Sequence, residues 1–209
     1  MLKRLRPVFE VTITIVAFLG VAIDMSGQKG LISALKLLNF FTIQSNLLVF
    51  IIMFLVVVNR FSKKSQPGYL IALSGGSALW IIMTGIIFHF MLSGVYQPQG
   101  IQRFSNIILH YLTPSLMTIY YFAFMDVKVI NTKYPIYWTG YPLIYGVASL
   151  IRGLFDGFYP YWFFNPTGSF PDGNGSYLNV ILIILVLALS FLIVGYIITF
   201  IKKLLFRKS

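Results

Sequence analysis

The chain has 209 residues, of which 58% are hydrophobic and only 10% are charged, and its mean hydropathy is +0.84. A soluble domain carries about 25% charged residues, so this composition indicates an integral membrane protein. The absence of cysteine excludes disulfides and thiolate chemistry, and with two histidines and five acids we expect no metal or other cofactor. The net charge of +11 lies in short loops and tails, which favours lipid headgroups over nucleic acid as the partner.

Apolar stretches predict six transmembrane helices that use the whole chain, residues 1–209, as a single domain. In chain order, they cover residues 7–25, 37–58, 69–92, 106–124, 136–154 and 177–201. Lys3, Arg4 and Arg6 precede the first stretch as they would in a signal peptide, but the stretch is long and no small-residue cleavage site follows it. We therefore expect an uncleaved first helix in an all-α bundle of six spans.

Basic residues in the loops predict the direction of these helices. Lys29, Lys36 and Arg103 lie in the loops after the first and third spans, and Arg152 lies at the end of the fifth. All the others of the 16 lysines and arginines lie in the two tails and in the second and fourth loops. Because cytoplasmic loops carry the excess of positive charge, both termini are predicted to be cytoplasmic.

Eight polar side chains share one depth in this arrangement, within about 10 Å of the outer face at a rise of about 1.5 Å per residue. Polar groups are costly in hydrocarbon, so a cluster of them predicts a functional site. Asp24, at the outer end of the first span, either is solvated or points into this cluster. The eight residues are Thr42, Ser45 and Asn46 in the second span, His89 in the third, Asn106 and His110 in the fourth, and Arg152 and Asp156 at the end of the fifth.

Helical spacing places the polar residues of the second and fourth spans on single faces of their helices. A polar stripe in a membrane helix turns toward the bundle interior rather than toward lipid. The two stripes are Asn39, Thr42, Ser45 and Asn46 in the second span, and Asn106, His110, Thr113 and Met117 in the fourth.

Each of these polar residues also has a structural interpretation. Hydroxyl and amide side chains in membrane helices commonly bond their own preceding carbonyl or a neighbouring helix. His89 suits the membrane interface, and Arg152 and Asp156, four residues apart, suit an ion pair. Glu10, near the inner end of the first span, is expected to meet Arg6 or lipid headgroups.

Taken together, a hydroxyl, an imidazole and further polar groups in one layer form a hydrolytic constellation. Threonine becomes a nucleophile when a base takes its proton, and imidazole is the best base near neutral pH. Thr42 and His110 are the candidates for these two roles. A third group must hold the ring in the right tautomer, and donors must stabilise an oxyanion. The candidates are Asp24, Asp156 and Asn106 for the first task, and Arg152, Ser45 and Asn46 for the second.

The loop between the fifth and sixth spans is rich in aromatic residues and contains several prolines and glycines, from Phe155 to Pro171. Proline and glycine argue against a regular helix there. Aromatic residues beside a span suit an interfacial belt, and a lid over an outer-facing cavity is the alternative interpretation.

Three segments resemble the bacterial Pr-six-Pr membrane protein family. They are Leu38–Leu47 with its FT-x-x-SN pattern, Leu109–Pro114, and Arg152-Gly followed by Tyr159-Pro-Tyr161. That group is distantly similar to the FAR/androgen-induced-gene membrane family. Its members are six-helix proteins with cytoplasmic termini that act as threonine hydrolases on fatty acid esters of hydroxy fatty acids. The resemblance implies Thr42 as nucleophile, His110 as base, a fatty acyl ester as substrate and a location in a bacterial plasma membrane.

The sequence is therefore consistent with three functions. The first is a membrane-embedded hydrolase of lipid esters that uses Thr42 and His110. The second is a protein that binds or transports a lipid or small molecule in the same cavity without chemistry. The third is an assembly partner of another membrane protein. A short distance between Thr42 Oγ1 and the imidazole of His110 favours the first.

Overall fold

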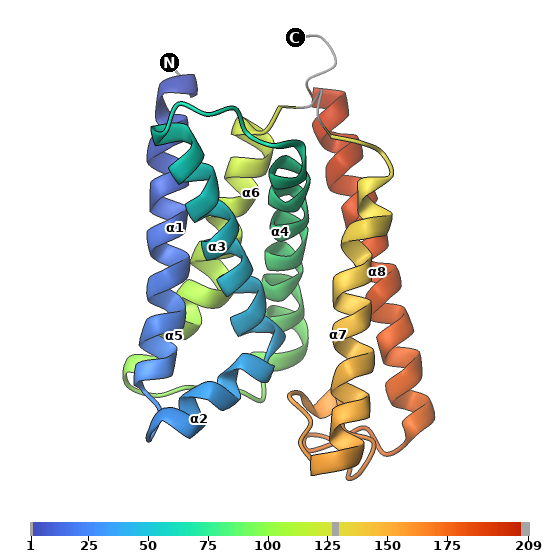
Figure 1. Ribbon diagram of the computed structural model, residues 1–209. Helices are drawn as coiled ribbons and strands as arrows, with labels where there is room; N and C mark the ends of the chain where they lie inside the picture. Colours follow the sequence, from blue (N-terminus) through green and yellow to red (C-terminus); the bar gives the residue numbers. More distant parts are fainter. Residues whose placement is uncertain (1, 127–129, 206–209) are drawn as a thin grey trace. The chain divides into compact units, whose positions relative to one another are not determined.

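The computed structural model describes residues 2–126 and 130–205, and these residues form helices without any strand. They form two compact units. The first consists of Met1–Asn131 and Lys202–Ser209, and the second consists of Thr132–Ile201. Figure 1 shows the chain coloured from the N-terminus to the C-terminus. The expectation of an all-helical chain is confirmed.

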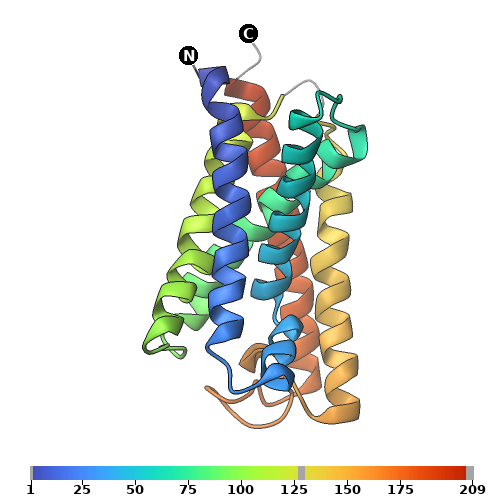
Figure 2. The same cartoon turned by 60° about the vertical axis from the view of Figure 1, so that its left-hand side comes forward.

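The first unit is a ring of four long helical rods. They are α1 (Leu2–Ser26), α3 (Phe41–Phe61), α4 (Gly68–Ile87) with its π-helical extension η2 (Phe88–Leu92), and a rod made of α5 (Ile101–Ile107), the π-helical turn η3 (Ile108–Leu112) and α6 (Thr113–Phe124). α1 packs against α3 and against both α5 and α6. α4 packs against α3 on one side and α6 on the other, which closes the ring. Figure 2, turned by 60°, shows α1 running beside the α5–α6 rod. The fully buried centre includes Ile13, Ala17, Val49, Met53, Leu79 and Met117.

The second unit contains α7 (Tyr134–Asp156), the short 3-10 helix η5 (Trp162–Phe164) and most of α8 (Tyr177–Leu205). Gly146 of α7 leaves room for Ile184 of α8, because a Cβ at position 146 would stand 3.2 Å from two of its side-chain carbons. α7 ends at Gly157, whose φ of 69° is the left-handed conformation that glycine adopts most easily.

Within the described residues, five helical segments are long and apolar enough to cross a membrane, namely Arg4–Ser26, Phe41–Phe61, Gly68–Leu92, Ile101–Phe124 and Tyr177–Leu205. Many of their apolar side chains stay exposed on the units, among them Phe18, Phe54 and Leu185. A helix that is hydrophobic all round is typical of a membrane span. α7 covers the predicted span 136–154 and has 23 residues, but it is not among these five segments.

Two differences from the predicted spans bear on the site. The span expected from residue 37 is broken at Phe40, whose extended backbone (φ −86°, ψ 133°) separates α3 from the 3-10 turn η1 (Leu37–Asn39). Asn39 therefore does not share a helix with Thr42, and the polar stripe of the second span begins at Thr42. The fourth span begins at Ile101 rather than at residue 106. The short helix α2 (Leu31–Lys36) precedes η1 and was not expected.

Candidate functional site

Thr42 and His110 lie in contact inside the first unit. The Oγ1 atom of Thr42 is 3.2 Å from the Nε2 atom of His110. Both side chains are buried, with 9% and 7% of their surface exposed. Thr42 is the second residue of α3 and His110 is the middle residue of η3, so packing between two rods brings together residues 68 positions apart. The distance is within the range over which a base can activate a hydroxyl.

The backbone of η3 fixes the tautomer of His110. The Nδ1 atom lies 3.0 Å from the carbonyl oxygen of Asn106. A carbonyl oxygen only accepts hydrogen bonds, so Nδ1 carries the proton and Nε2 is the acceptor. The hydroxyl of Thr42 therefore donates to Nε2. The group that orients the ring is the main chain of Asn106, rather than the side chain of Asp24, Asp156 or Asn106.

Gly20, Gly85 and the ring of Phe88 pack closely against η3. A Cβ on Gly85 would stand 2.8 Å from the carbonyl oxygen of His110, so only glycine lets α4 approach so closely. On the side of α1, a Cβ on Gly20 would stand 2.7 Å from Cγ2 of Ile108. The ring of Phe88 stacks on the imidazole of His110, with centroids 3.7 Å apart and an angle of 19° between the planes. η3 is thus packed closely against α1 and α4, and its imidazole lies against the ring of Phe88.

Asn46 and Ser45 support the pair from α3. The Nδ2 atom of Asn46 donates to the carbonyl oxygens of Thr42 (2.8 Å) and Leu109 (3.2 Å), which links α3 to η3 beside the two site residues. The Oγ atom of Ser45 lies 3.1 Å from the carbonyl oxygen of Thr42 and 2.9 Å from Oγ1 of Thr84. Both hydrogens of the Asn46 amide are used in this way, so Asn46 is a positioning residue and not an oxyanion donor.

Three buried polar atoms near the pair have no hydrogen-bond partner among the residues that the structure describes. They are Oδ1 of Asn46, Oδ1 of Asn106 and Oγ1 of Thr113. Asn46 and Thr113 are fully buried, with 0% of their surface exposed. Buried polar atoms are nearly always paired, so an unpaired group calls for an explanation such as a ligand or a catalytic role. Thr113 is the single buried hydroxyl without a partner among the described residues.

The other predicted residues of the first unit lie outside this contact network. The carboxylate of Asp24 accepts a hydrogen bond of 2.7 Å from Oγ of Ser105. His89 is exposed, and its Nδ1 atom lies 3.4 Å from the hydroxyl of Tyr111. Asp24 and His89 therefore have hydrogen-bond partners other than Thr42 and His110. The exposed position of His89 agrees with its interfacial interpretation.

Arg152 and Asp156 belong to the second unit and bind each other. Arg152 Nε donates to the Asp156 carboxylate at 2.9 Å, and the guanidinium lies 4.8 Å from the centre of the Phe158 ring. The backbone N–H of Phe158, followed by the charge and hydrogen bond of Arg152, holds the pKa of Asp156 below its ordinary value. The loop that follows is closed by contacts within the same unit, including the Tyr159 ring against Gly153 and a buried Phe164 near Tyr145.

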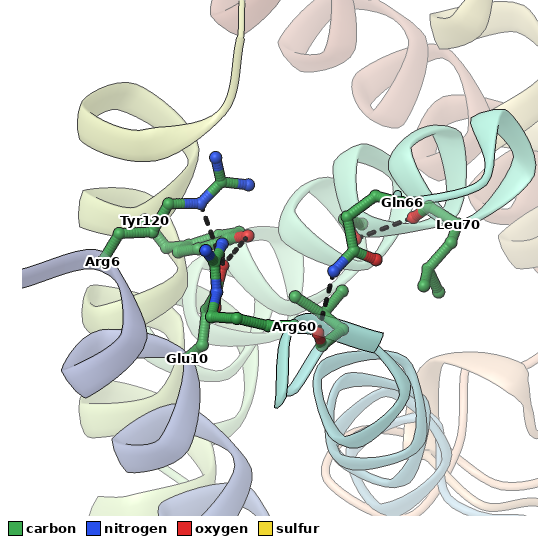
Figure 3. A network of polar contacts seen from close by, with 8 residues as sticks. Arg6, Glu10, Arg60, Gln66, Leu70 and Tyr120 are labelled. Atoms are coloured by element: carbon green, nitrogen blue, oxygen red, sulfur yellow. Dashed lines mark hydrogen bonds and ion pairs between the residues drawn. The ribbon is translucent and has the colours of Figure 1, made fainter. Parts of the chain in front are cut away.

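Sequence reasoning missed a second polar cluster, which is centred on Glu10 (Figure 3). Glu10 is fully buried, and its carboxylate accepts hydrogen bonds from Arg6 (2.9 Å) and from the hydroxyl of Tyr120 (3.1 Å). Arg60 adds two more, from Nε and, at 2.8 Å, from Nη2. The contact with Arg6 was expected, but Arg60 and Tyr120 are distant in sequence. The available signal was that Glu10 is the one glutamate of the chain and lies within an apolar span.

Metal ligation has no support in the described residues, where no group of three or more histidine, aspartate or glutamate side chains could hold an ion. Thr42 and His110 supply a hydroxyl and an imidazole, with neutral hydrogen-bonding groups beside them. No protein-family model, curated protein or solved structure matches this chain.

Proposed function

We propose that this protein is a membrane-embedded hydrolase of fatty acyl esters, with Thr42 as nucleophile and His110 as general base. The observation that carries the proposal is the 3.2 Å contact between Thr42 Oγ1 and His110 Nε2, with Nδ1 tied to the carbonyl of Asn106. Nucleophilic catalysis by a hydroxyl requires a base in contact with the hydroxyl and a group that orients the base. The resemblance to the threonine hydrolases of the FAR/androgen-induced-gene family supports the same two residues.

Acyl transfer to the enzyme comes first. Thr42 Oγ1 forms a bond to the ester carbonyl carbon while its proton passes to His110 Nε2. The tetrahedral intermediate then collapses, the bond to the alcohol oxygen breaks, and the imidazolium returns its proton to that oxygen. An alcohol leaves, and an acyl-threonine ester remains.

Water completes the cycle by the same route. Nε2 of His110 takes a proton from water, and the oxygen forms a bond to the acyl carbon. Collapse breaks the bond to Thr42 Oγ1, which regains its proton from the imidazolium. The products are a fatty acid and the free enzyme, and neither step needs a metal or cofactor.

The developing oxyanion requires a hydrogen-bond donor, and Thr113 is the candidate that we favour. Its hydroxyl is buried, lacks a partner and follows His110 by three residues. Ser45 and Asn46, two of the three candidates from the sequence, already use their donors within the protein. A donor that is fixed before the reaction stabilises negative charge without reorganisation, which is usually a large contribution to catalysis.

The proposal includes a membrane arrangement of six spans with α7 as the fifth, both termini in the cytoplasm and the Thr42 site in the outer half. The excess of basic residues in the tails and in alternate loops supports that direction. A lipid substrate would then enter laterally from the outer leaflet, in a bacterial plasma membrane.

Binding of a lipid or small molecule without chemistry is the second candidate function. The observation in its favour is that two of the three unpartnered buried atoms, Oδ1 of Asn46 and Oδ1 of Asn106, are acceptors. A ligand with a hydroxyl or N–H group would satisfy them. Saturable binding by the purified protein without any turnover supports this alternative.

Hydrolysis of a fatty acyl ester by purified protein tests the proposal. We expect Thr42→Ala to lower the rate by at least about 10³-fold, as removal of a nucleophile does in other hydrolases. Thr118→Ala is the matched control, because Thr118 is a membrane-helix threonine that bonds the carbonyl oxygen of Pro114, four residues earlier, at 2.7 Å. Equal rates in wild type and Thr42→Ala contradict the proposal.

A further inference from the structure

The Glu10 cluster carries an excess of positive charge. One carboxylate is shared by two guanidiniums, those of Arg6 and Arg60, and by the neutral hydroxyl of Tyr120. The cluster thus has a net charge of +1 when all its groups are in their ordinary forms. Arg6 and Arg60 keep 32% and 30% of their side-chain surface exposed, whereas Glu10 is fully covered. The positive charge that Glu10 does not neutralise therefore lies on the partly exposed guanidiniums.

A cavity of about 230 Å³ opens beside this cluster. One water needs about 10–15 Å³, and pockets for drug-sized ligands measure about 300–1,000 Å³, so the space suits a small polar group such as a headgroup. Its lining residues come from the end of the first unit where α3 ends and α4 begins. Figure 1 shows that the N-terminal end of α1 lies at this same end of the unit. The walls of the cavity are formed by Arg6, Val56, Gln66, Ile71, Ser74, Tyr120, Met125 and Asp126.

The cavity offers one cationic donor and several acceptors. Arg6 has five N–H groups, and its contacts with Glu10 and Tyr120 leave donors over. Gln66 uses Nε2 on the carbonyl oxygen of Val56 at 2.8 Å, which leaves its buried Oε1 atom without a partner. The Ser74 hydroxyl donates to the carbonyl oxygen of Leu70 at 2.8 Å, so its oxygen remains an acceptor.

A second charge of opposite sign completes the cavity. Asp126 is exposed and lines the same space. The negative charge of Asp126 also attracts Lys202. A carboxylate has about four acceptor positions, so it can bind more than one cationic group. The lining of the cavity therefore includes a guanidinium, a carboxylate and an unpaired amide oxygen.

We propose that this cavity binds a zwitterion in which an anionic oxygen group and a primary ammonium lie close together, as in phosphoethanolamine. Arg6 binds the anionic group, for which a guanidinium is the favoured partner. Gln66 Oε1, Ser74 and Asp126 accept from the ammonium, whose three N–H donors match three acceptors. Phosphatidylethanolamine in the membrane and free phosphoethanolamine share this chemistry.

Lipid binding to the purified full-length chain, measured by native mass spectrometry, tests the proposal. The probes are phosphatidylethanolamine, phosphatidylcholine and phosphatidylglycerol with identical acyl chains. The choline lipid has the same charges without N–H donors, and the glycerol lipid has the anion without a cation. We expect phosphatidylethanolamine to bind at least about tenfold more tightly than either, the effect of one charge-assisted hydrogen bond. Equal or tighter binding of either of the other two lipids overturns the proposal.

Two variants of Gln66 distinguish ligand binding from a structural role. Gln66→Met removes the free acceptor and Gln66→Glu keeps an acceptor and adds charge, while both lose the bond to Val56. We expect the preference for phosphatidylethanolamine over phosphatidylcholine to fall about tenfold in Gln66→Met and to persist in Gln66→Glu. Gln99→Met, in an exposed loop, is the control. A similar loss of preference in both Gln66 variants contradicts the proposed role of Oε1.

Competition identifies the source of the ligand. Displacement of the bound lipid by free phosphoethanolamine shows that the cavity takes the soluble zwitterion, and retention of the lipid shows that it takes the headgroup. The proposal does not depend on hydrolysis at Thr42, so we expect Thr42→Ala to keep the full lipid preference. Loss of ester hydrolysis and loss of lipid preference are therefore separate results.

Discussion

The two polar clusters of the first unit, around Thr42 and around Glu10, lie at opposite ends of α3 and differ in charge and in hydrogen bonding. Thr42 is the second residue of α3 and Arg60 is the second-to-last, so at about 1.5 Å per residue they stand about 27 Å apart along its axis. The Glu10 cluster consists of charged groups, and every oxygen of its carboxylate is hydrogen-bonded. The Thr42 cluster consists of neutral groups and leaves several buried polar atoms unpaired.

This difference separates a cluster that holds the fold from one that is suited to chemistry. A buried carboxylate whose partners are complete resists removal, because its loss strands the opposite charges. Buried neutral groups with unused donors and acceptors contribute little to stability, and they interact with a reacting group when one is present. Variants at the two ends of α3 are therefore expected to affect different measurements.

The largest expected effect on a supporting residue is at Thr113. Thr113→Val keeps the shape of the side chain and removes the unpaired hydroxyl, so we expect ester hydrolysis to fall about 10²- to 10³-fold, as with other oxyanion donors. The free energy of unfolding should change by less than about 1 kcal/mol, because no hydrogen bond within the protein is lost. Unchanged kinetics in this variant would remove Thr113 from the mechanism.

At the other end of α3, Glu10→Gln is expected to lower the free energy of unfolding by about 2–4 kcal/mol. Breaking a fully buried ion pair costs about 3–5 kcal/mol, and the partial exposure of Arg6 and Arg60 reduces that cost. Denaturation in detergent measures the loss, and hydrolysis per folded molecule should remain at the wild-type level. A drop in activity without a drop in stability would reverse the assignment of the two clusters.

Gly85→Ala tests how closely the chemistry depends on packing. The added Cβ would meet the carbonyl oxygen of His110 at 2.8 Å, which cannot move without shifting η3. We expect a destabilisation of about 1–3 kcal/mol and a fall in hydrolysis of up to about 10²-fold from displacement of the imidazole. Gly20→Ala is the comparison, because its Cβ would meet side-chain carbons of Ile108 and Leu109 rather than a backbone atom. Equal effects of the two variants would contradict this account of η3.

The smallest expected effect is at Asp156, which lies outside both clusters. The Phe158 N–H and the Arg152 charge lower the pKa of the folded carboxyl, so its contribution to stability is present at neutral pH. That contribution is lost as the pH falls from about 4 through the lowered folded pKa. Asp156→Asn should lower the unfolding temperature slightly at pH 7, with a smaller difference at pH 3, in a thermal unfolding assay. A difference that grows toward pH 3 would exclude this origin.

Helical periodicity was sufficient to predict that Thr42, Ser45 and Asn46 face the bundle interior, and hydropathy was sufficient to predict helices over all six expected spans. Periodicity assumes an unbroken helix, and it failed at Phe40, where the extended backbone excludes Asn39 from the stripe. The extent of the fourth rod was also underestimated, because Gln102 and Arg103 lower the hydropathy of its first turn.

Contacts between helices could not be read from spacing. Asn106 was a candidate through its side chain, but its main-chain carbonyl holds His110. Asp24 was a candidate for the same task, and it binds Ser105 instead. The cluster at Glu10 depends on Arg60 and Tyr120, which lie 50 and 110 residues away. The packing of the helices decides which side chains meet, and a single sequence does not reveal that packing.

Chemical labelling of Thr42 examines the proposed pair at the level of a single atom. A fluorophosphonate probe reacts with activated hydroxyls, and peptide mass spectrometry locates the adduct. We expect the adduct on Thr42 in the wild-type protein and none in His110→Gln, because glutamine cannot take the proton of the nucleophile. An adduct on a different residue, or equal labelling of Thr42 in His110→Gln, would contradict the assignment of Thr42 as a nucleophile activated by His110.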